Sequence, residues 1–115
     1  MHVNLWKETI DILSEYGKTF DDVLFIKGDD FGITKDNFET VAKRTNYDNG
    51  YGAQRIARDL VLVGEDWWIE RGEYDGSEWW DFKTMPLKKD EIKNVKRLAG
   101  GMWGTLMEIN KEVTN

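Results

Sequence analysis

Two tryptophan pairs on either side of an Asp-Gly step constrain this chain more than any other feature. The pairs and the step are Trp67-Trp68, Trp79-Trp80 and Asp75-Gly76. An Asp-Gly step suits a type I′ turn because both central residues of that turn need φ > 0, and aromatic residues favour strands. The segment from residue 66 to 83 therefore predicts an antiparallel hairpin that reverses at residues 75–76.

A two-residue loop also fixes which residues of the two strands oppose each other. It pairs Tyr74 with Ser77, and the ladder continues from there. The further pairs are Arg71–Trp80, Glu70–Asp81, Ile69–Phe82 and Trp68–Lys83. A longer loop would change all of these pairs.

The predicted register sorts the side chains of the hairpin onto two faces. One face carries Trp67, Ile69, Arg71, Trp80 and Phe82, and the other carries Trp68, Glu70, Tyr74, Trp79, Asp81 and Lys83. We expect the first face to join the core, with Arg71 snorkelling across Trp80 as a cation–π pair. The second face is either covered by a helix or exposed as a surface for a partner.

Length and composition predict a single globular domain over residues 1–115. The chain is 40% hydrophobic and 33% charged, and no apolar run approaches the roughly 20 residues that span a bilayer. Its first residues, Met-His-Val-Asn-Leu-Trp-Lys, lack the layout of a signal peptide. The absence of cysteine excludes disulfides and thiolate metal sites. We expect a cytoplasmic protein that does not engage a membrane.

The net charge of −6 is unevenly distributed along the chain. Residues 65–81 carry seven acids and one base, whereas residues 83–97 carry six bases and two acids. An acidic surface repels nucleic acid, so direct nucleic-acid binding is disfavoured. Such a surface attracts basic proteins, although the same charge also serves solubility.

Helical and strand patterns alternate before the hairpin. We expect helices over residues 4–16, ended by Gly17, and over residues 35–45, capped by Thr34. A short helix is expected over residues 53–60. Strands are expected near residues 23–26, 60–63, 67–73 and 78–84, and the first of these is alternatively a continued helical turn. Residues 46–52 are the most loop-like stretch.

The C-terminal segment repeats apolar residues at helical spacing. The series Ile92, Val95, Ala99, Met102, Leu106, Ile109 and Val113 alternates steps of three and four residues. We expect a helix whose Val95, Ala99, Met102, Leu106 and Ile109 form a seam for a homo-dimer. Gly100, Gly101 and Gly104 interrupt it, so either one helix bends there or two helices meet there.

These patterns together predict an α+β fold. Its sheet would be antiparallel and three- to four-stranded, a meander that includes the tryptophan hairpin. The N-terminal, middle and C-terminal helices would pack against this sheet.

The residue types offer little for catalysis. Serine occurs only at positions 14 and 77, and the one histidine, His2, lies near the N-terminus, so a nucleophilic triad is disfavoured. Glu70 and Asp81, placed opposite each other, keep a carboxylate-dependent hydrolase open as an alternative. We expect no cofactor, no bound metal and no catalytic residues.

The second face of the hairpin is the best candidate for function. Aromatic rings among carboxylates are typical of a surface that docks a basic partner. The residues that we expect to bind the partner are Trp68, Glu70, Glu73, Tyr74, Glu78, Trp79 and Asp81.

A resemblance to other proteins rests on residues 59–83 and on the flanking Tyr51-Gly52 and Met85-Pro86. Residues 59–83 include the run Asp-Trp-Trp-Ile-Glu-Arg-Gly-Glu-Tyr-Asp-Gly-Ser-Glu-Trp-Trp-Asp-Phe-Lys. They resemble a group of small uncharacterised phage and prophage proteins of Gram-positive bacteria. The resemblance implies a bacterial host cytoplasm and brings no catalytic residues. By analogy with other small acidic phage proteins, it implies binding and inhibition of a host defence or nucleic-acid-handling protein, as an anti-CRISPR-like inhibitor would do.

Overall fold

The computed structural model describes residues 2–50, 52–100 and 102–111. Where the sequence predicted one domain over residues 1–115, the contacts within the chain divide it into two compact units, Met1–Met85 and Pro86–Asn115. In the described part of the chain, no helix is long and apolar enough to cross a membrane.

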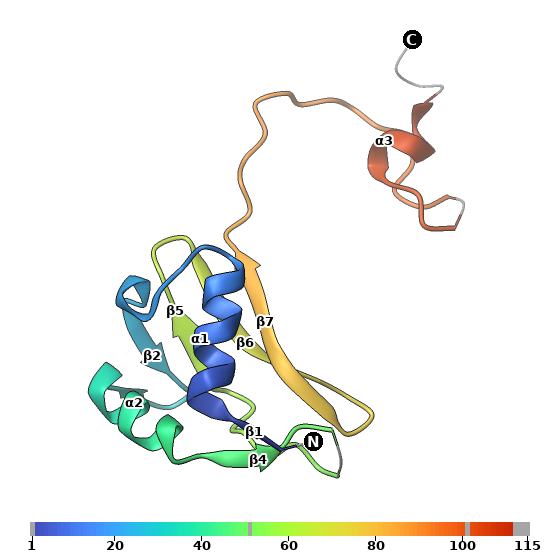
Figure 1. Ribbon diagram of the computed structural model, residues 1–115. Coiled ribbons are helices and arrows are strands. Elements are labelled where there is room, and N and C mark those ends of the chain that lie inside the picture. The colour runs from blue at the N-terminus through green and yellow to red at the C-terminus, as the bar shows by residue number, and fades with distance from the viewer. Residues whose placement is uncertain (1, 51, 101, 112–115) are drawn as a thin grey trace. The chain divides into compact units, whose positions relative to one another are not determined.

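The first unit is built on a five-stranded antiparallel sheet (Figure 1). In spatial order its strands are β3 (Gly32–Ile33), β2 (Phe25–Lys27), β5 (Val61–Val63), β6 (Trp67–Tyr74) and β7 (Ser77–Thr84). A separate two-stranded sheet pairs β1 (His2–Asn4) with β4 (Asn46–Asp48). The predicted α+β class is confirmed, but three to four strands was too few. The four strands predicted near residues 23–26, 60–63, 67–73 and 78–84 correspond to β2, β5, β6 and β7. The strand of this sheet that was missed, β3, has only two residues, too few to show a strand pattern.

Two α-helices belong to this unit, α1 (Leu5–Glu15) and α2 (Lys35–Lys43), together with a short 3₁₀ turn, η1 (Phe20–Asp22). Asn4 and Thr34 cap α1 and α2 by accepting backbone N–H groups at 3.0 Å. Gly17 follows α1 with φ of 71°, the left-handed conformation that ends many helices. Both predicted helices are confirmed to within two residues at each end.

The hairpin register is confirmed in full. Asp75 and Gly76 have φ of 50° and 87°, as a type I′ turn requires. Tyr74 pairs with Ser77, and every further pair follows as predicted up to the pair formed by Trp67 and Thr84.

One face of the sheet, called the inner face here, is buried by the two helices. The strands contribute Ile26, Leu62, Ile69, Trp67 and Trp80 to this core, and the helices contribute Leu5, Leu13, Phe38 and Ala42. The tryptophans predicted to face the core are therefore buried. Burial of each such side chain stabilises the fold by about 1.5–3 kcal/mol relative to exposure.

The helix predicted over residues 53–60 is wrong. The described backbone there consists of bends and a turn. The N–H groups of Arg55 and Ile56 bond to the carboxylate of Glu78 at 2.7 and 3.2 Å, so this segment is fastened to a distant strand of the hairpin. A carboxylate oxygen of Asp59 accepts the N–H of Asp29 at 2.7 Å, which fastens the end of this segment to the turn after β2.

The C-terminal helix with its heptad seam is also wrong. In the second unit, residues 86–100 and 102–105 contain no helix, and α3 covers only Leu106–Ile109. Val95, Ala99 and Met102 therefore lie outside any helix, and Leu106 and Ile109 lie in a single turn. Gly101 and Val113 lie outside the described residues. Homo-dimerisation stays a prediction, but the described residues do not form the long helix on which its seam was placed.

Asn110 organises the second unit instead. Its side chain is buried, accepts the N–H groups of Lys96 and Arg97, and donates to the carbonyls of Arg97 and Leu106. Gly104 leaves room for a side chain of this turn, because a Cβ there would lie 2.5 Å from the Cγ2 of Ile109. This close packing and the side-chain bonds of Asn110 together replace the regular helix.

Candidate functional site

The side of the sheet opposite α1 and α2 is the candidate site. This outer face consists of Phe25, Lys27, Val61, Val63, Trp68, Glu70, Gly72, Trp79, Asp81 and Lys83. Both α-helices of the first unit place their buried side chains in the inner core, so neither covers the outer face. The alternative that one of these helices buries its aromatic rings is therefore excluded.

The strand register arranges the outer face in rows. Phe25, Val63, Trp68 and Lys83 lie side by side across four strands, as do Lys27, Val61, Glu70 and Asp81. The first row is mostly apolar and the second mostly charged. An apolar row beside a charged row can contact a partner through both burial and charge pairing.

Each outer tryptophan is bound to a carboxylate two residues away on its own strand. The indole N–H of Trp68 donates to Glu70 at 2.6 Å, and that of Trp79 donates to Asp81 at 2.8 Å. Residues two apart on a strand share a face, which explains both contacts. Each pair fixes a flat aromatic ring next to a negative charge.

Gly72 is the reason that Trp79 can lie across the neighbouring strand. The two residues are paired in the register, and a Cβ at position 72 would lie 2.6 Å from the indole nitrogen and 2.5 Å from an Asp81 oxygen. No role for this glycine was predicted from the sequence. A glycine opposite a tryptophan in a predicted hairpin is the signal that could have shown it.

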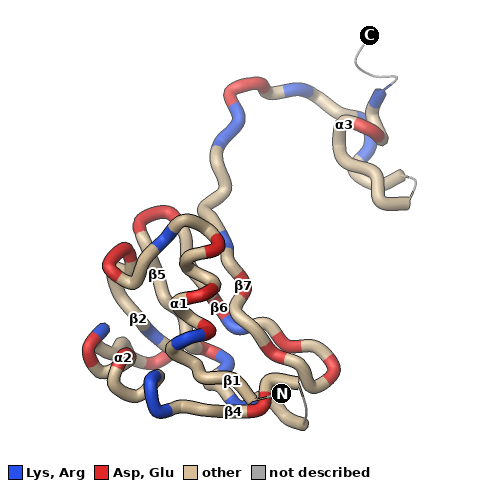
Figure 2. Tube along the Cα trace, in the orientation of Figure 1, with Lys and Arg blue, Asp and Glu red and all other residues tan. Residues whose placement is uncertain are grey.

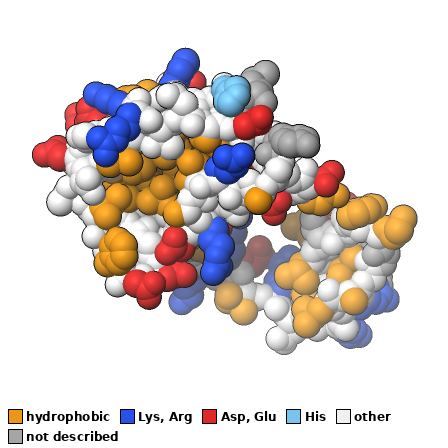
Figure 3. Space-filling model, turned by 90° about the horizontal axis from the view of Figure 1, so that it is seen from below, with side chains coloured by type: hydrophobic (Ala, Val, Ile, Leu, Met, Phe, Trp, Pro, Cys, Tyr) orange, Lys and Arg blue, Asp and Glu red, His pale blue; other side chains and the backbone are white. Residues whose placement is uncertain are grey.

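The tip of the hairpin extends the acidic character of the site. Tyr74 is 76% exposed, and Glu73 and Asp75 beside it are exposed as well. Glu73 was predicted to lie on the outer face, but it pairs with Glu78 and so points to the same side of the hairpin as Arg71. In Figure 2 the Cα trace is red, the colour of Asp and Glu, along this end of β6 and β7. Figure 3 gives a further view of the first unit, on which charged groups of both signs surround an apolar area.

Glu78 does not belong to this surface, so its predicted role is wrong. Its residue is only 2% exposed, and its carboxylate lies 2.9 Å from the Arg71 guanidinium. The register explains this placement, because Glu78 lies two residues from Trp80 and shares its face. With Arg71 and Glu78 paired inside, residues 65–81 keep six acids and no other base.

Arg71 is the centre of a buried polar network. Its Nη1 lies 3.4 Å from Glu8, and its Nη2 donates to Tyr47 and Glu78 at 2.9 Å each. The predicted cation–π contact with Trp80 is confirmed at 4.7 Å, but the side chain does not snorkel, since none of it is exposed. An arginine on a predicted core face needs carboxylate partners.

Tyr47 links the network to α1. Its hydroxyl donates to Glu8 at 2.5 Å while accepting from Arg71. Burial raises the pKa of Tyr47 well above its usual range, and the hydrogen bond to Glu8 raises it further. The folded protein therefore holds this phenol in its neutral form.

We expect the stabilising contribution of Tyr47 to be lost in alkaline solution. In the unfolded chain the phenol ionises near pH 10, whereas the folded state resists ionisation, so stability falls above about pH 10. Urea unfolding from pH 7 to 11 should show Tyr47→Phe less stable than the wild type by about 1–3 kcal/mol at pH 7. That difference should shrink above pH 10. A difference that stays constant to pH 11 would contradict this assignment.

The described residues include no group of three metal-ligating side chains arranged around a common point. Glu70 and Asp81 do lie opposite each other as predicted, but each accepts an indole N–H. The outer face therefore presents two oriented rings and two engaged carboxylates, which is an arrangement suited to contact with another molecule.

Comparison with known proteins gives no relative for this arrangement. No protein-family model, curated protein or solved structure matches the chain.

Proposed function

We propose that this chain is a non-enzymatic binding protein whose outer face docks on a basic surface of another protein. One observation carries the proposal: Trp68 and Trp79 lie on a sheet face that neither α-helix of their unit covers, each hydrogen-bonded to a carboxylate. Tyr74, which shares the face of Trp68 and Glu70, extends this contact surface to the tip of the hairpin.

The chemistry of the face favours a cationic protein partner. Tryptophan and tyrosine supply the largest binding contributions in protein interfaces, and each ring offers roughly 150–250 Å² of buryable surface. The six acids of residues 65–81 would raise the association rate with a positively charged partner. Lys83 lies opposite Trp68 at the end of one row and Lys27 at the far end of the other, but the indole N–H groups of both tryptophans are bound to acids.

The resemblance to phage and prophage proteins suggests which partner this is. We propose a bacterial host protein of defence or nucleic-acid handling, whose basic groove ordinarily holds nucleic acid. Occupation of that groove by an acidic protein inhibits the host protein, in the manner of an anti-CRISPR inhibitor. The chain itself would act in the host cytoplasm.

The test begins with the partner, captured from a lysate of a Gram-positive host, identified and purified. Its dissociation constant is then measured with the wild type and with Trp68→Ala, Trp79→Ala and Gly72→Ala. We expect each variant to bind at least about tenfold more weakly, because a central aromatic contact is worth more than about 1.4 kcal/mol. Gly72→Ala acts by displacing the Trp79 ring, with no side chain removed.

Charge is tested with a matched pair of variants. Asp81→Lys and Asp30→Lys change the net charge equally, but Asp30 is an exposed residue in the bend between β2 and β3. We expect only Asp81→Lys to abolish binding, and we expect wild-type binding to weaken as salt rises. Equal effects of the two variants, or unchanged binding by Trp79→Ala, would remove the outer face as the interface.

A further inference from the structure

β7 is a terminal strand of the sheet, and most of its outward edge is unpaired. In the register, residues 77, 79, 81 and 83 bond to β6, so residues 78, 80, 82 and 84 direct their backbone groups outward. The N–H of Glu78 shows this directly, because it donates to the carbonyl of Asn49 at 2.9 Å. Within the described residues, the outward N–H groups of Trp80 and Phe82 have no such partner.

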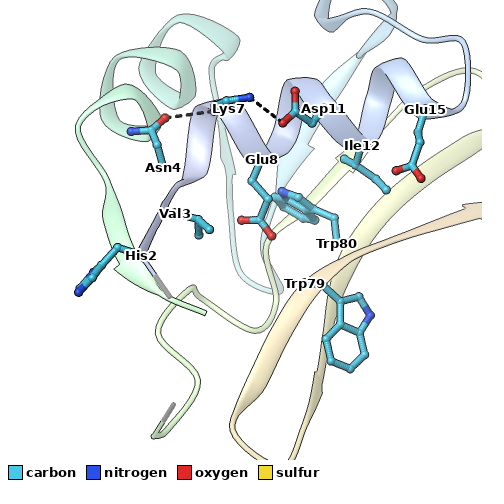
Figure 4. A pocket seen from close by; sticks show the side chains of 10 residues that line it. All are labelled: His2, Val3, Asn4, Lys7, Glu8, Asp11, Ile12, Glu15, Trp79 and Trp80. Carbon is cyan, nitrogen blue, oxygen red and sulfur yellow. Dashed lines mark hydrogen bonds and ion pairs between the residues drawn. The ribbon is translucent and has the colours of Figure 1, made fainter. Parts of the chain in front are cut away.

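A groove of about 480 Å³ runs between this edge and α1 (Figure 4). Trp79 and Trp80 line it from β7, and Glu8, Ile12 and Glu15 line it from α1. Figure 4 shows Trp80 directed toward α1 and Trp79 directed away from the helix. The groove thus offers a strand edge on one side and a helix surface on the other.

The helix side of the groove is acidic. Glu8, Asp11 and Glu15 lie along it, and Lys7, the one lysine among its described lining residues, is bound to Asp11 at 3.0 Å. Glu8 is 17% exposed and already binds Tyr47 and Arg71, so Glu15 is the most available acid of the row. Glu8 and Glu15 are about 10 Å apart along the helix axis. Side chains on one face of a strand recur about every 7 Å, so two successive basic side chains of an added strand can reach this acidic row.

We propose that an extended segment of another protein, with Lys or Arg at alternate positions, adds to β7 as a sixth strand. Its backbone pairs with the outward groups of Trp80 and Phe82, and its basic side chains lie along the acidic row of α1, with Glu15 as the main charge partner. This is strand addition, in which the main chain gives affinity and alternate side chains give specificity. The inference goes beyond the outer-face proposal, because it uses the edge of the sheet and one side of α1.

A second copy of the chain fits this edge less well. Antiparallel pairing of two β7 strands about a twofold axis places both α1 helices on the same side of the joined sheet. Their acidic rows would then face each other across the seam, and like charges in such positions are destabilising.

Amide hydrogen exchange on the full chain, followed by NMR, tests the inference. In the free protein, the amides of Trp80 and Phe82 should exchange at least about 100-fold faster than those of Trp79 and Asp81, which bond to β6. A ten-residue peptide of alternating Lys and Thr is then added. We expect it to slow exchange at Trp80 and Phe82 at least about tenfold, with little change at Trp79 and Asp81.

Matched peptides and variants separate strand addition from simple charge attraction. A peptide with the same composition in two blocks, five Lys and then five Thr, should bind at least about tenfold more weakly, as should the alternating peptide with N-methyl groups on every second amide. Glu15→Lys should weaken binding, whereas Trp68→Ala and Asp30→Lys should leave it unchanged. Failure at the outer face and failure at this edge are therefore distinguished by different variants.

Three results would overturn the inference. Slow exchange at Trp80 and Phe82 in the dilute free protein would show that its own chain covers the edge. Protection that grows with protein concentration would show that a second copy does so. Equal binding of the alternating and block peptides would show that charge alone attracts them.

Discussion

Replacement of Arg71 by methionine should destabilise the first unit by about 3–5 kcal/mol. The substitution retains much of the side-chain volume but removes the cation bound to Glu78, whose side chain is 1% exposed. Breaking a buried ion pair by removing one partner leaves the other charge uncompensated, which accounts for the size of the loss. Tyr47 also loses a donor. Urea unfolding, followed by circular dichroism, measures the change.

The control for Arg71→Met is its double variant with Glu78→Gln. Removing the buried charge together with its partner should recover part of the stability, because the amide that replaces the carboxylate keeps an oxygen that can accept from the backbone of Arg55 or Ile56. The two changes should therefore be strongly non-additive. A loss below about 1 kcal/mol in Arg71→Met, or simple additivity, would show that the network does not hold the fold together.

Two adjacent tryptophans should respond very differently to truncation. Trp80→Ala should cost about 3–5 kcal/mol, since this residue is 4% exposed, and its indole donates to Thr9 at 3.0 Å. Trp79→Ala should cost less than about 1 kcal/mol, because Trp79 lies on the outer face and is 37% exposed. Both values come from urea unfolding under identical conditions.

Trp80→Phe refines this comparison. Phenylalanine keeps an aromatic ring beside Arg71 but cannot donate the hydrogen bond to Thr9. The free energy of unfolding of Trp80→Phe should therefore lie between those of the wild type and Trp80→Ala. Similar losses in Trp79→Ala and Trp80→Ala would mean that the hairpin does not separate its rings between a buried and an open face.

The hairpin could be predicted because its signals are local. Asp75-Gly76 sets the turn, the turn sets the register, and the register assigns each ring to a face. The two helices were predictable for the same reason, since Asn4 or Thr34 and the apolar period act within a few residues. The outer face could therefore be proposed as a site from the sequence.

What could not be predicted depends on contacts between distant segments. In the sequence, Glu78 cannot be told apart from the surface acids around it. Its burial depends on the backbone N–H groups of Arg55 and Ile56, which come from a distant loop and bind its carboxylate. Tyr47 and Glu8 reach Arg71 from separate elements, 24 and 63 residues away. In the C-terminal unit, an apolar period suggested a long helix, but its described residues contain only the short helix α3, which side-chain bonds of Asn110 join to Arg97.

The separation of the indole rings by the hairpin can be measured directly on the full chain labelled with 5-fluorotryptophan. Fluorine NMR signals are assigned by single Trp→Phe variants, and a soluble gadolinium chelate then broadens the exposed rings. We expect strong broadening of Trp79 and of Trp103, which is 92% exposed, and little broadening of Trp67 and Trp80. Protection of Trp79 equal to that of Trp80 would contradict the open outer face on which the proposed function depends.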